Sequence, residues 1–512
     1  MTPTSIEKPV VDRRPPLARW DRTRLAVVLF GVVGGIALRA FVLLTPLGAP
    51  DSDEAVVGLM ARHLAHGEHT TFFWGQNFGG TPFLYLMTPV IRVFGTSFFT
   101  LRLTGTLLAA VNAVLVWRVG RRLFSEQGAI AAGLVSWVWP AMAVWFSVRE
   151  QLFYVPTVTA GLLAWLIALG RSRPRGWPDA GRWLACGFVL GLGWWMSPNI
   201  IYFAVPLAVW MLWDGERRAR WPMALAAVPG AVVGAAPWLR FNLSHDWASM
   251  RLPVFDSPSP PAANARFLAE GAYPGLIGLR QPFYGAWHGA WAQFAGWPLA
   301  LVAVAVLTGV ALRARGLDGI ALVCFPILYL AQPFGTVYSN LRYVFWLAPM
   351  LALAIGRVAP TPRRTVAIVV AALVASSASL IGFHTNVTRE PTPLLVANTE
   401  DTGPAVDLLL EQDLTHGYAG YWTAFVVTYQ SGERIIVAPT SFNDRYPRYR
   451  AQVDAADHPF WMVITGSDQE RALRADLDHL GVGATWHTAG EWTILVPDRA
   501  VRPDEVSAEA RY

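Results

Sequence analysis

Long apolar stretches, separated by short arginine-rich segments, constrain the fold of this chain more than any other feature. Of its 512 residues, 54% are hydrophobic and only 15% are charged, whereas about 25% of the residues in an average soluble domain are charged. A run of about 20 apolar residues is long enough to cross a bilayer as a helix. The pattern excludes a single soluble core and predicts an all-α polytopic membrane protein with about eleven spanning helices.

Two of the apolar stretches carry further information. The first is too long for the apolar part of a cleaved signal peptide, so we interpret it as a retained anchor. The fifth is short and Pro198 separates it from the sixth, so these two are expected to form a helical hairpin at the outer face. The expected spans are 25–44, 101–118, 128–147, 152–169, 183–196, 199–213, 222–239, 291–312, 318–333, 343–357 and 365–383.

Clusters of arginine give the orientation. Loops rich in Arg and Lys stay in the cytoplasm, and with these spans every cluster falls on the same side as the N-terminal segment 1–24. The transmembrane module 25–383 then has two long outer loops, 46–100 and 240–290, and the tail 384–512 lies outside. The clusters are at 118–122, 171–182, 217–220, 313–315 and 363–364.

The basic residues also bear on location and partners. Apart from Lys8 they are all arginines, a bias typical of GC-rich bacterial genomes, so we expect a bacterial cytoplasmic membrane with membrane lipids as neighbours. The net charge of +6 is spread over short loops and does not form the stripe of a nucleic-acid-binding protein. Cys186 and Cys324 lie inside apolar stretches, which indicates neither disulfides nor a thiolate metal site.

The first outer loop contains a pattern of its own. Asp51, Asp53 and Glu54 precede apolar residues at helical spacing, and acidic side chains favour the N-terminal end of a helix. We expect an amphipathic helix lying along the membrane surface. The apolar piece 82–94 contains Pro89 and is too short to span, so a second surface helix or a re-entrant helix is expected there.

These carboxylates stand where they can carry chemistry. At the outer end of a span a carboxylate can act as a general base or bind a divalent cation, for which Asp51 and Asp53 are the candidates. The alternative is that the triplet only starts a helix, with Asp53 as the cap. Glu150, at the outer end of the third span, either lies in a solvated turn or faces the same cavity as Asp53.

Outer-side arginines and tyrosines are candidates for substrate binding, because a guanidinium group offers a fork of donors to phosphate. Arg39 lies about 8 Å inside the first span, so it either reaches the interface or binds a lipid headgroup between helices. The candidates are Arg39, Arg149, Tyr85, Tyr154, Arg266, Arg280, Arg342 and Tyr343.

The tail is expected to form a small extracytoplasmic α/β domain that packs over the outer cavity. Hydrophobic periodicity predicts helices at 404–414 and 468–480 and strands at 434–438, 460–465 and 491–496. Two aromatic and basic pieces of the tail either contact substrate or pack the core, namely Tyr421-Trp422 and Arg445-Tyr446-Pro447.

The region from about 35 to 160 contains a series of short motifs: Asp53-Glu54, Ala61-Arg62, His66-Gly67-Glu68, Asn77, Pro82-Phe83-Leu84-Tyr85, Phe94-Gly95, Arg102-Leu103 and Gly120-Arg121-Arg122-Leu123-Phe124. With these motifs the region resembles the C-type membrane glycosyltransferases, and within them the branch of the protein O-mannosyltransferases and the lipid A aminoarabinose transferase. Further along, Asn340-Leu341-Arg342-Tyr343 looks like a later feature of the same family.

The resemblance implies a glycosyltransferase that moves a sugar from a polyprenyl-phosphate donor to a glycan, lipid or protein acceptor outside the cytoplasm. The family's proposed base maps onto Asp53, and a second acidic position fits Glu150 by its place alone. The expected reaction inverts the sugar, with Asp53 deprotonating the acceptor. Val56 stands where the aminoarabinose branch has Arg, and the outer loops hold no lysine for the phosphate, so the sugar and acceptor are not implied.

Two other functions fit a membrane protein of this kind. A transporter or flippase for lipid-linked cell-envelope glycans would need charged residues at mid-membrane and a repeated half-structure. A non-catalytic assembly protein would use the tail for binding and would not need the acidic triplet. Most ionisable residues lie at the ends of the expected spans, which favours chemistry at the outer surface.

The topology can be tested with reporter fusions at Asp179 and after Pro391. We expect a cytoplasmic signal at Asp179, because it lies among the arginines of 171–182, and an extracytoplasmic signal after Pro391. An extracytoplasmic signal at the first position, or a cytoplasmic one at the second, would contradict the orientation.

Overall fold

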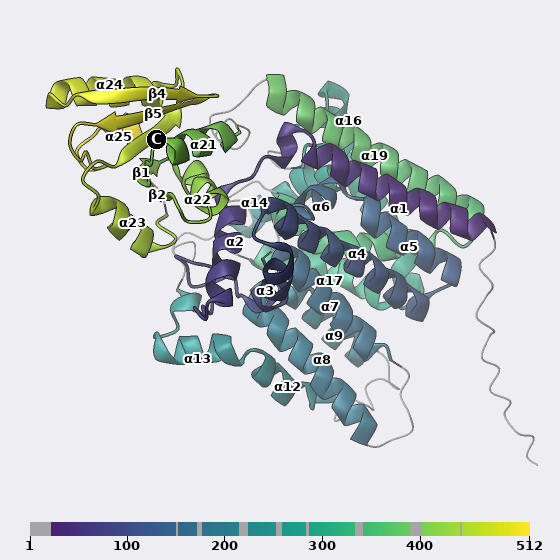
Figure 1. Ribbon diagram of the computed structural model, residues 1–512. Coiled ribbons are helices and arrows are strands. Elements are labelled where there is room, and N and C mark those ends of the chain that lie inside the picture. Colours follow the sequence, from purple (N-terminus) through teal and green to yellow (C-terminus); the bar gives the residue numbers. More distant parts are fainter. Residues whose placement is uncertain are drawn as a thin grey trace, which may run out of the picture.

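A helical body carries the C-terminal domain at one end (Figure 1). The computed structural model describes residues 22–149, 152–170, 177–213, 224–251, 259–282, 286–332, 341–389, 401–440 and 443–511. Glu150 and most of the N-terminal segment 1–24 lie outside these ranges. The structure is mostly helical with one small sheet, as the composition predicts.

Every expected span coincides with a helix or a pair of helices. Within the described ranges, four helices are long and apolar enough to cross a membrane: α1 (Arg22–Leu43), α4 (Phe98–Leu123), α16 (Ala290–Arg313) and α19 (Pro362–Arg389). The total of about eleven spans stays a prediction. The remaining helices of the body are α5 (Glu126–Val138), α6 (Ala141–Phe146), α7 (Tyr154–Ala168), α8 (Trp177–Met196), α9 (Ile201–Trp213), α12 (Ala227–Gly234), α13 (Ala236–Ser244), α14 (Pro261–Phe267), α15 (Tyr273–Leu276), α17 (Leu317–Ala331) and α18 (Leu347–Arg357).

Short helical turns and prolines divide several of these stretches. The third expected span is two helices, α5 and α6, because Pro140 lies between them and has no N–H to continue the α5 ladder. The hairpin expected around Pro198 is present, since a short turn joins α8 to α9. The turns are η1 (Pro46–Gly48), η2 (Pro198–Ile200), η3 (Ala248–Met250), η5 (Leu268–Ala272) and η6 (Leu341–Val344).

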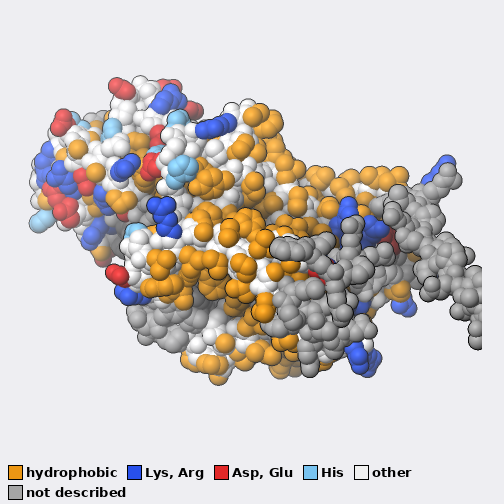
Figure 2. All heavy atoms as spheres, turned by 90° about the horizontal axis from the view of Figure 1, so that it is seen from below, with side chains coloured by type: hydrophobic (Ala, Val, Ile, Leu, Met, Phe, Trp, Pro, Cys, Tyr) orange, Lys and Arg blue, Asp and Glu red, His pale blue; other side chains and the backbone are white. Residues whose placement is uncertain are grey.

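The surface of the body is apolar, whereas that of the C-terminal domain is charged. Figure 2 shows hydrophobic side chains spread over the helices and Arg, Asp and Glu gathered on the C-terminal domain. Large apolar side chains of α1, α4, α16 and α19 are exposed, among them Leu29, Leu107, Phe294 and Val374. An apolar surface of this extent requires an apolar solvent, which a bilayer provides.

The first outer loop forms α2 (Ser52–Ala65) and α3 (Pro82–Phe94), as expected. The expectation that α2 lies along the membrane surface is wrong, because α2 is buried between α3, α4 and the C-terminal domain. Its apolar residues cover more than one face, which suits a helix enclosed on several sides. A side chain at Gly58 would meet the ring of Tyr429 at 2.4 Å, so the C-terminal domain approaches the α2 backbone closely.

The C-terminal domain is a five-stranded sheet in the order β2-β1-β3-β5-β4. Strands β2, β1 and β3 are parallel, and β5 and β4 are antiparallel to their neighbours. The three expected strands and two expected helices are present. Strands β1 and β4 are not predicted, because β1 contains Gly417 and lacks an apolar run, and β4 is largely exposed. The elements are α21 (Gly403–Glu411), β1 (His416–Ala419), α22 (Tyr421–Gln430), β2 (Ile436–Pro439), α23 (Pro447–Asp454), β3 (Phe460–Ile464), α24 (Asp468–Leu480), β4 (Ala484–Ala489), β5 (Trp492–Pro497) and α25 (Ala508–Arg511).

The C-terminal domain and the first outer loop share one hydrophobic core. Val57 and Met60 of α2 and Met87 of α3 belong to the same buried cluster as Phe425 of α22 and Trp461 of β3. The tail therefore packs on the first outer loop and does not hang from α19 as a separate unit. This contact brings residues far apart in the sequence to the N-terminal end of α2.

Candidate functional site

The three carboxylates at the start of α2 have three different environments. Asp51 is the N-cap: its Oδ1 accepts a hydrogen bond from the backbone N–H of Glu54 at 2.9 Å. Its Oδ2 accepts a second from Arg149 Nη2 at 2.8 Å. The expectation that Asp53 caps this helix is therefore wrong. Asp51 starts the helix two residues earlier and pairs with a buried arginine, whose side chain is 7% exposed.

Glu54 forms a buried ion pair with Arg102 of α4. Both carboxylate oxygens accept hydrogen bonds from the guanidinium group, each at 2.8 Å. The side chain of Glu54 is 2% exposed and that of Arg102 is 12% exposed. A two-point pair of this kind fixes the position of α2 against α4, so neither residue is open to a substrate.

Asp53 is the open carboxylate of the three, with 40% of its side chain exposed. Its Oδ1 accepts a hydrogen bond from the hydroxyl of Tyr421 and lies 3.4 Å from Arg445 Nη2. Desolvation of the carboxylate by the surrounding protein raises the pKa of Asp53. Arg445, Tyr421 and Arg342 each lower this pKa, but by less. A raised pKa makes the ionised carboxylate a stronger base.

Arg445 is held firmly beside Asp53. Its Nε donates to the Tyr421 hydroxyl at 2.8 Å, and its Nη1 donates to Oε1 of Gln76 at 2.9 Å. The guanidinium carbon lies 4.9 Å from the ring centre of Phe73 and 5.5 Å from that of Tyr421. Gln76 and Phe73 belong to the first outer loop, so this arginine joins the loop to the C-terminal domain.

Arg342 is the outer-side arginine whose charge acts on the site. It belongs to η6, its guanidinium carbon lies 6.0 Å from the ring centre of Tyr343, and its charge helps to lower the pKa of Asp53. Arg342 is therefore within electrostatic reach of Asp53, and its role as a phosphate ligand stays a prediction.

The other predicted arginines are committed elsewhere. Arg39 is 4% exposed and donates to Ser147, Trp137 and Gly35 at 3.0–3.1 Å, so it joins helices inside the body. Arg266 pairs with Glu270 at 3.0 Å, and Arg280 donates to the Glu270 carbonyl while lying over Trp287. These two form a separate group on the second outer loop.

The predicted tyrosines also differ. Tyr154 is buried and stacks between Phe146 and Trp346, so it packs the core. Tyr85 is exposed on α3 and stacks on His69, at a ring-centre distance of 6.0 Å.

Gln76 is a site residue that the sequence analysis missed, because no sequence pattern indicates that the amide of a loop residue will bind an arginine of the tail.

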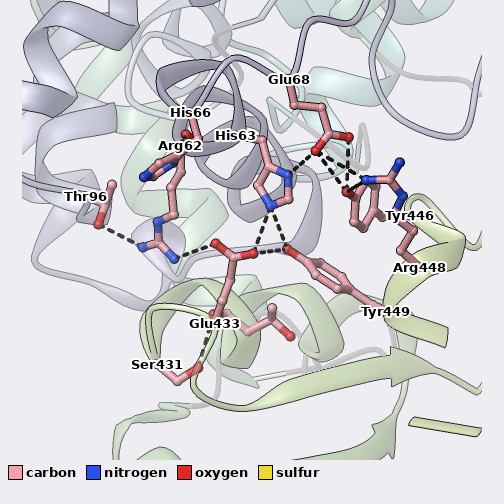
Figure 3. A network of polar contacts seen from close by, with 11 residues as sticks. Arg62, His63, His66, Glu68, Thr96, Ser431, Glu433, Tyr446, Arg448 and Tyr449 are labelled. Atoms are coloured by element: carbon pink, nitrogen blue, oxygen red, sulfur yellow. Dashed lines mark hydrogen bonds and ion pairs between the residues drawn. The ribbon is translucent and has the colours of Figure 1, made fainter. Parts of the chain in front are cut away.

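A second polar network fastens the other end of α2 to the C-terminal domain (Figure 3). His63 lies between two carboxylates, with Nδ1 2.8 Å from Glu68 and Nε2 2.8 Å from Glu433. The Tyr449 hydroxyl donates to Glu433 at 2.6 Å, and Arg62 pairs with the same carboxylate. Burial lowers the pKa of His63, but its hydrogen bonds to the two carboxylates outweigh this and raise it.

A cavity of about 440 Å³ opens beside this network, lined by His63, Glu68, Glu433, Tyr446, Arg448 and Tyr449 among others. The polar groups that line the cavity bond to one another, and these bonds attach α2 to the C-terminal domain. Across the described ranges, no three His, Cys, Asp or Glu side chains lie together where they could hold a metal ion.

Comparison with known proteins bears on the fold. A family model described as dolichyl-phosphate-mannose-protein mannosyltransferase matches residues 81–241, less than half of the chain. The crystal structure of ArnT from Cupriavidus metallidurans bound to undecaprenyl phosphate superposes with a TM-score of 0.56 at 13% identity, covering 95% of this chain and 99% of that one. The apo state of the same protein gives 0.57 at 14% identity, covering 94% and 99%. A search of curated protein sequences finds no match.

These likenesses establish the fold. The chain has the fold of the C-type membrane glycosyltransferases, over almost its whole length, and the resemblance predicted from the first outer loop is confirmed. At this low identity the likeness shows the fold alone, and the chemistry depends on the side chains at the start of α2.

The Glu54–Arg102 pair provides a test of the structural role that we assign to Glu54. We expect Arg102→Leu to destabilise the protein by about 3–5 kcal/mol, because it leaves the Glu54 carboxylate buried without a partner. The double variant Glu54→Leu/Arg102→Leu should recover most of that loss, since both charges are gone. Thermal unfolding in detergent measures both, and equal losses in the single and double variants would contradict the structural assignment of Glu54.

Proposed function

We propose that the protein is a glycosyltransferase that moves a sugar from a polyprenyl-phosphate-linked donor to an acceptor outside the cytoplasm, with inversion and with Asp53 as the general base. The observation that carries the proposal is the different pairing of the three carboxylates. Asp51 and Glu54 are each paired with a buried or half-buried arginine, which leaves Asp53 open to a substrate. Its fold and the family model both belong to glycosyltransferases.

The proposed reaction needs a base for the acceptor hydroxyl and a cation for the leaving phosphate. An ionised Asp53 oxygen takes the proton of the acceptor hydroxyl as that oxygen attacks the anomeric carbon. The bond from the anomeric carbon to the lipid phosphate breaks, and the phosphate leaves with the electron pair on the opposite side, so the sugar is inverted. In this proposal the charge of Arg342 stabilises the departing phosphate, and its electrostatic effect on Asp53 supports that role.

A lipid-linked donor agrees with the surroundings of the site. The apolar surfaces of the body helices would let a polyprenyl chain approach through the bilayer, while α2 and the C-terminal domain keep the carboxylate outside the expected spans. ArnT was crystallised with undecaprenyl phosphate, which supports a donor of the same class here. A bacterial cytoplasmic membrane, and a cytoplasmic N-terminus, remain part of the proposal.

The transporter and assembly functions are not favoured. Both would leave unexplained why a carboxylate with a raised pKa stands partly exposed beside Arg445. A perturbed carboxylate in such a place is typical of catalytic sites.

Asp53→Asn tests the base directly. We expect transfer to fall by about 10²–10⁴-fold in a folded protein, because the amide keeps the size of the side chain but cannot take a proton. Transfer is measured with purified protein, a panel of radiolabelled polyprenyl-phosphate sugars and membrane extract as the source of acceptor. The matched control is Asp51→Asn, which should retain more activity per folded molecule. Near-normal turnover in Asp53→Asn together with an inactive Asp51→Asn would show that the base is misassigned.

Arg342→Ala tests the phosphate ligand. In nanodiscs we expect the dissociation constant for undecaprenyl phosphate, measured by native mass spectrometry, to rise by roughly tenfold or more, since a hydrogen bond to a charged group is lost. Arg266→Ala is the control, because Arg266 is exposed and paired with Glu270. If Arg266→Ala weakens binding and Arg342→Ala does not, the phosphate lies at the second outer loop instead.

A further inference from the structure

We propose that the C-terminal domain is part of the catalytic centre: Tyr421 and Arg445 hold one oxygen of Asp53, Oδ1, and thereby present the other, Oδ2, to the acceptor hydroxyl. This inference rests on the proposed function of Asp53 as the base. It assigns Arg445 and Tyr421 as positioning residues, and it gives the tail a role in the chemical step in addition to covering the cavity.

The contacts of the two oxygens of Asp53 differ. Both donors of the C-terminal domain reach Oδ1, the Tyr421 hydroxyl by a short hydrogen bond and Arg445 Nη2 at 3.4 Å. Within the described residues no hydrogen bond is made to Oδ2, and the side chain is 40% exposed. A carboxylate held at one oxygen keeps a fixed orientation, and its second oxygen keeps lone pairs for an incoming proton.

The group that holds Oδ1 is rigid and lies across the junction of loop and tail. Arg445 is itself held by Gln76 and by the Tyr421 hydroxyl, and its side chain is 10% exposed. The first outer loop comes so close that a side chain at Gly75 would lie 2.9 Å from the Arg445 Cα. Gly75 also has a φ of +69°, which L side chains rarely adopt, so this close approach depends on glycine.

The same arginine also bears on the ionisation of Asp53. The charged groups that act on this carboxylate are Arg445 and Arg342, which favour the ionised form, and Asp51, which opposes it. Tyr421, as a hydrogen-bond donor, also favours the ionised form. Burial already raises the pKa of Asp53, so the loss of Arg445 should raise it further. A base works only when it is ionised, so the acid limb of the pH–rate profile should then move to higher pH.

The experiment compares Arg445→Gln, Arg445→Lys and Tyr421→Phe with the control Arg471→Gln. Arg471 belongs to the same domain, is 64% exposed and pairs with Asp468 on α24, so its loss removes the same charge away from Asp53. Two readouts are used. One is the pH–rate profile with the labelled polyprenyl-phosphate sugar that the wild-type protein turns over. The other is an infrared pH titration of the Asp53 carboxyl, taken as the difference from Asp53→Asn, which needs no substrate.

We expect Arg445→Gln to lower kcat by about 10–100-fold, which corresponds to the loss of a hydrogen bond to a charged group. The dissociation constant for undecaprenyl phosphate should stay within about twofold of the wild-type value, and the infrared midpoint and the acid limb should both move to higher pH. Tyr421→Phe should shift both in the same direction. Arg445→Lys keeps the charge and should return the midpoint toward wild type. Arg471→Gln should match wild type throughout.

The inference is overturned if folded Arg445→Gln has the wild-type infrared midpoint and the wild-type kcat, or if it changes only donor binding. Its failure is distinct from failure of the proposed function. If Asp53→Asn is inactive and Arg445→Gln is normal, Asp53 is the base without help from the tail. If Asp53→Asn itself keeps full turnover, the proposed function is wrong.

Discussion

The packing of α2 between the helical body and the C-terminal domain is the constraint on which the rest of the structure depends. Helix α2 contributes to the core shared with the tail, and polar groups fasten it at both ends. Tyr421 and Arg445 meet it at Asp53, and Glu433 and Tyr449 meet it at His63. Since Asp53 is the first acidic residue inside this helix, its direction is set by everything that holds α2. The C-terminal domain thereby contacts a carboxylate of the first outer loop.

Burial explains why three neighbouring carboxylates differ. Glu54 is enclosed and is stable there only because Arg102 matches both of its oxygens. Asp51 satisfies a backbone N–H that the start of a helix leaves without a partner, and Arg149 balances its charge. Asp53 belongs to neither pair, and its side chain is 40% exposed, against 17% for Asp51 and 2% for Glu54. The arginines of η6 and the tail then act on a carboxylate that is still open to solvent.

Local patterns predicted much of the fold but little of the site. Apolar periodicity predicted the helices at the expected spans and, in the tail, α21, α24, β2, β3 and β5, because these depend on nearest neighbours in the sequence. It did not predict α14 and α15 of the second outer loop, nor α22, α23, α25, β1 and β4 of the tail. It placed α2 on a surface, since nothing in 46–100 reveals that the tail covers it. The bond from Tyr421 to Asp53 joins residues 368 positions apart, a contact that only tertiary packing creates. Arg39 follows neither alternative that its depth suggested, because depth along a helix says nothing about the carbonyl groups that receive its donors.

We propose that the donor phosphate binds at Arg342, within reach of the anchored carboxylate of Asp53. Cryo-electron microscopy of the full chain in nanodiscs with undecaprenyl phosphate tests this most directly. We expect phosphate density beside Arg342, facing Asp53, with Tyr421 and Arg445 still in contact with Oδ1 of that carboxylate. Phosphate density at Arg266 and Arg280 instead, or an Arg445 turned away from Asp53 in the bound state, would contradict it.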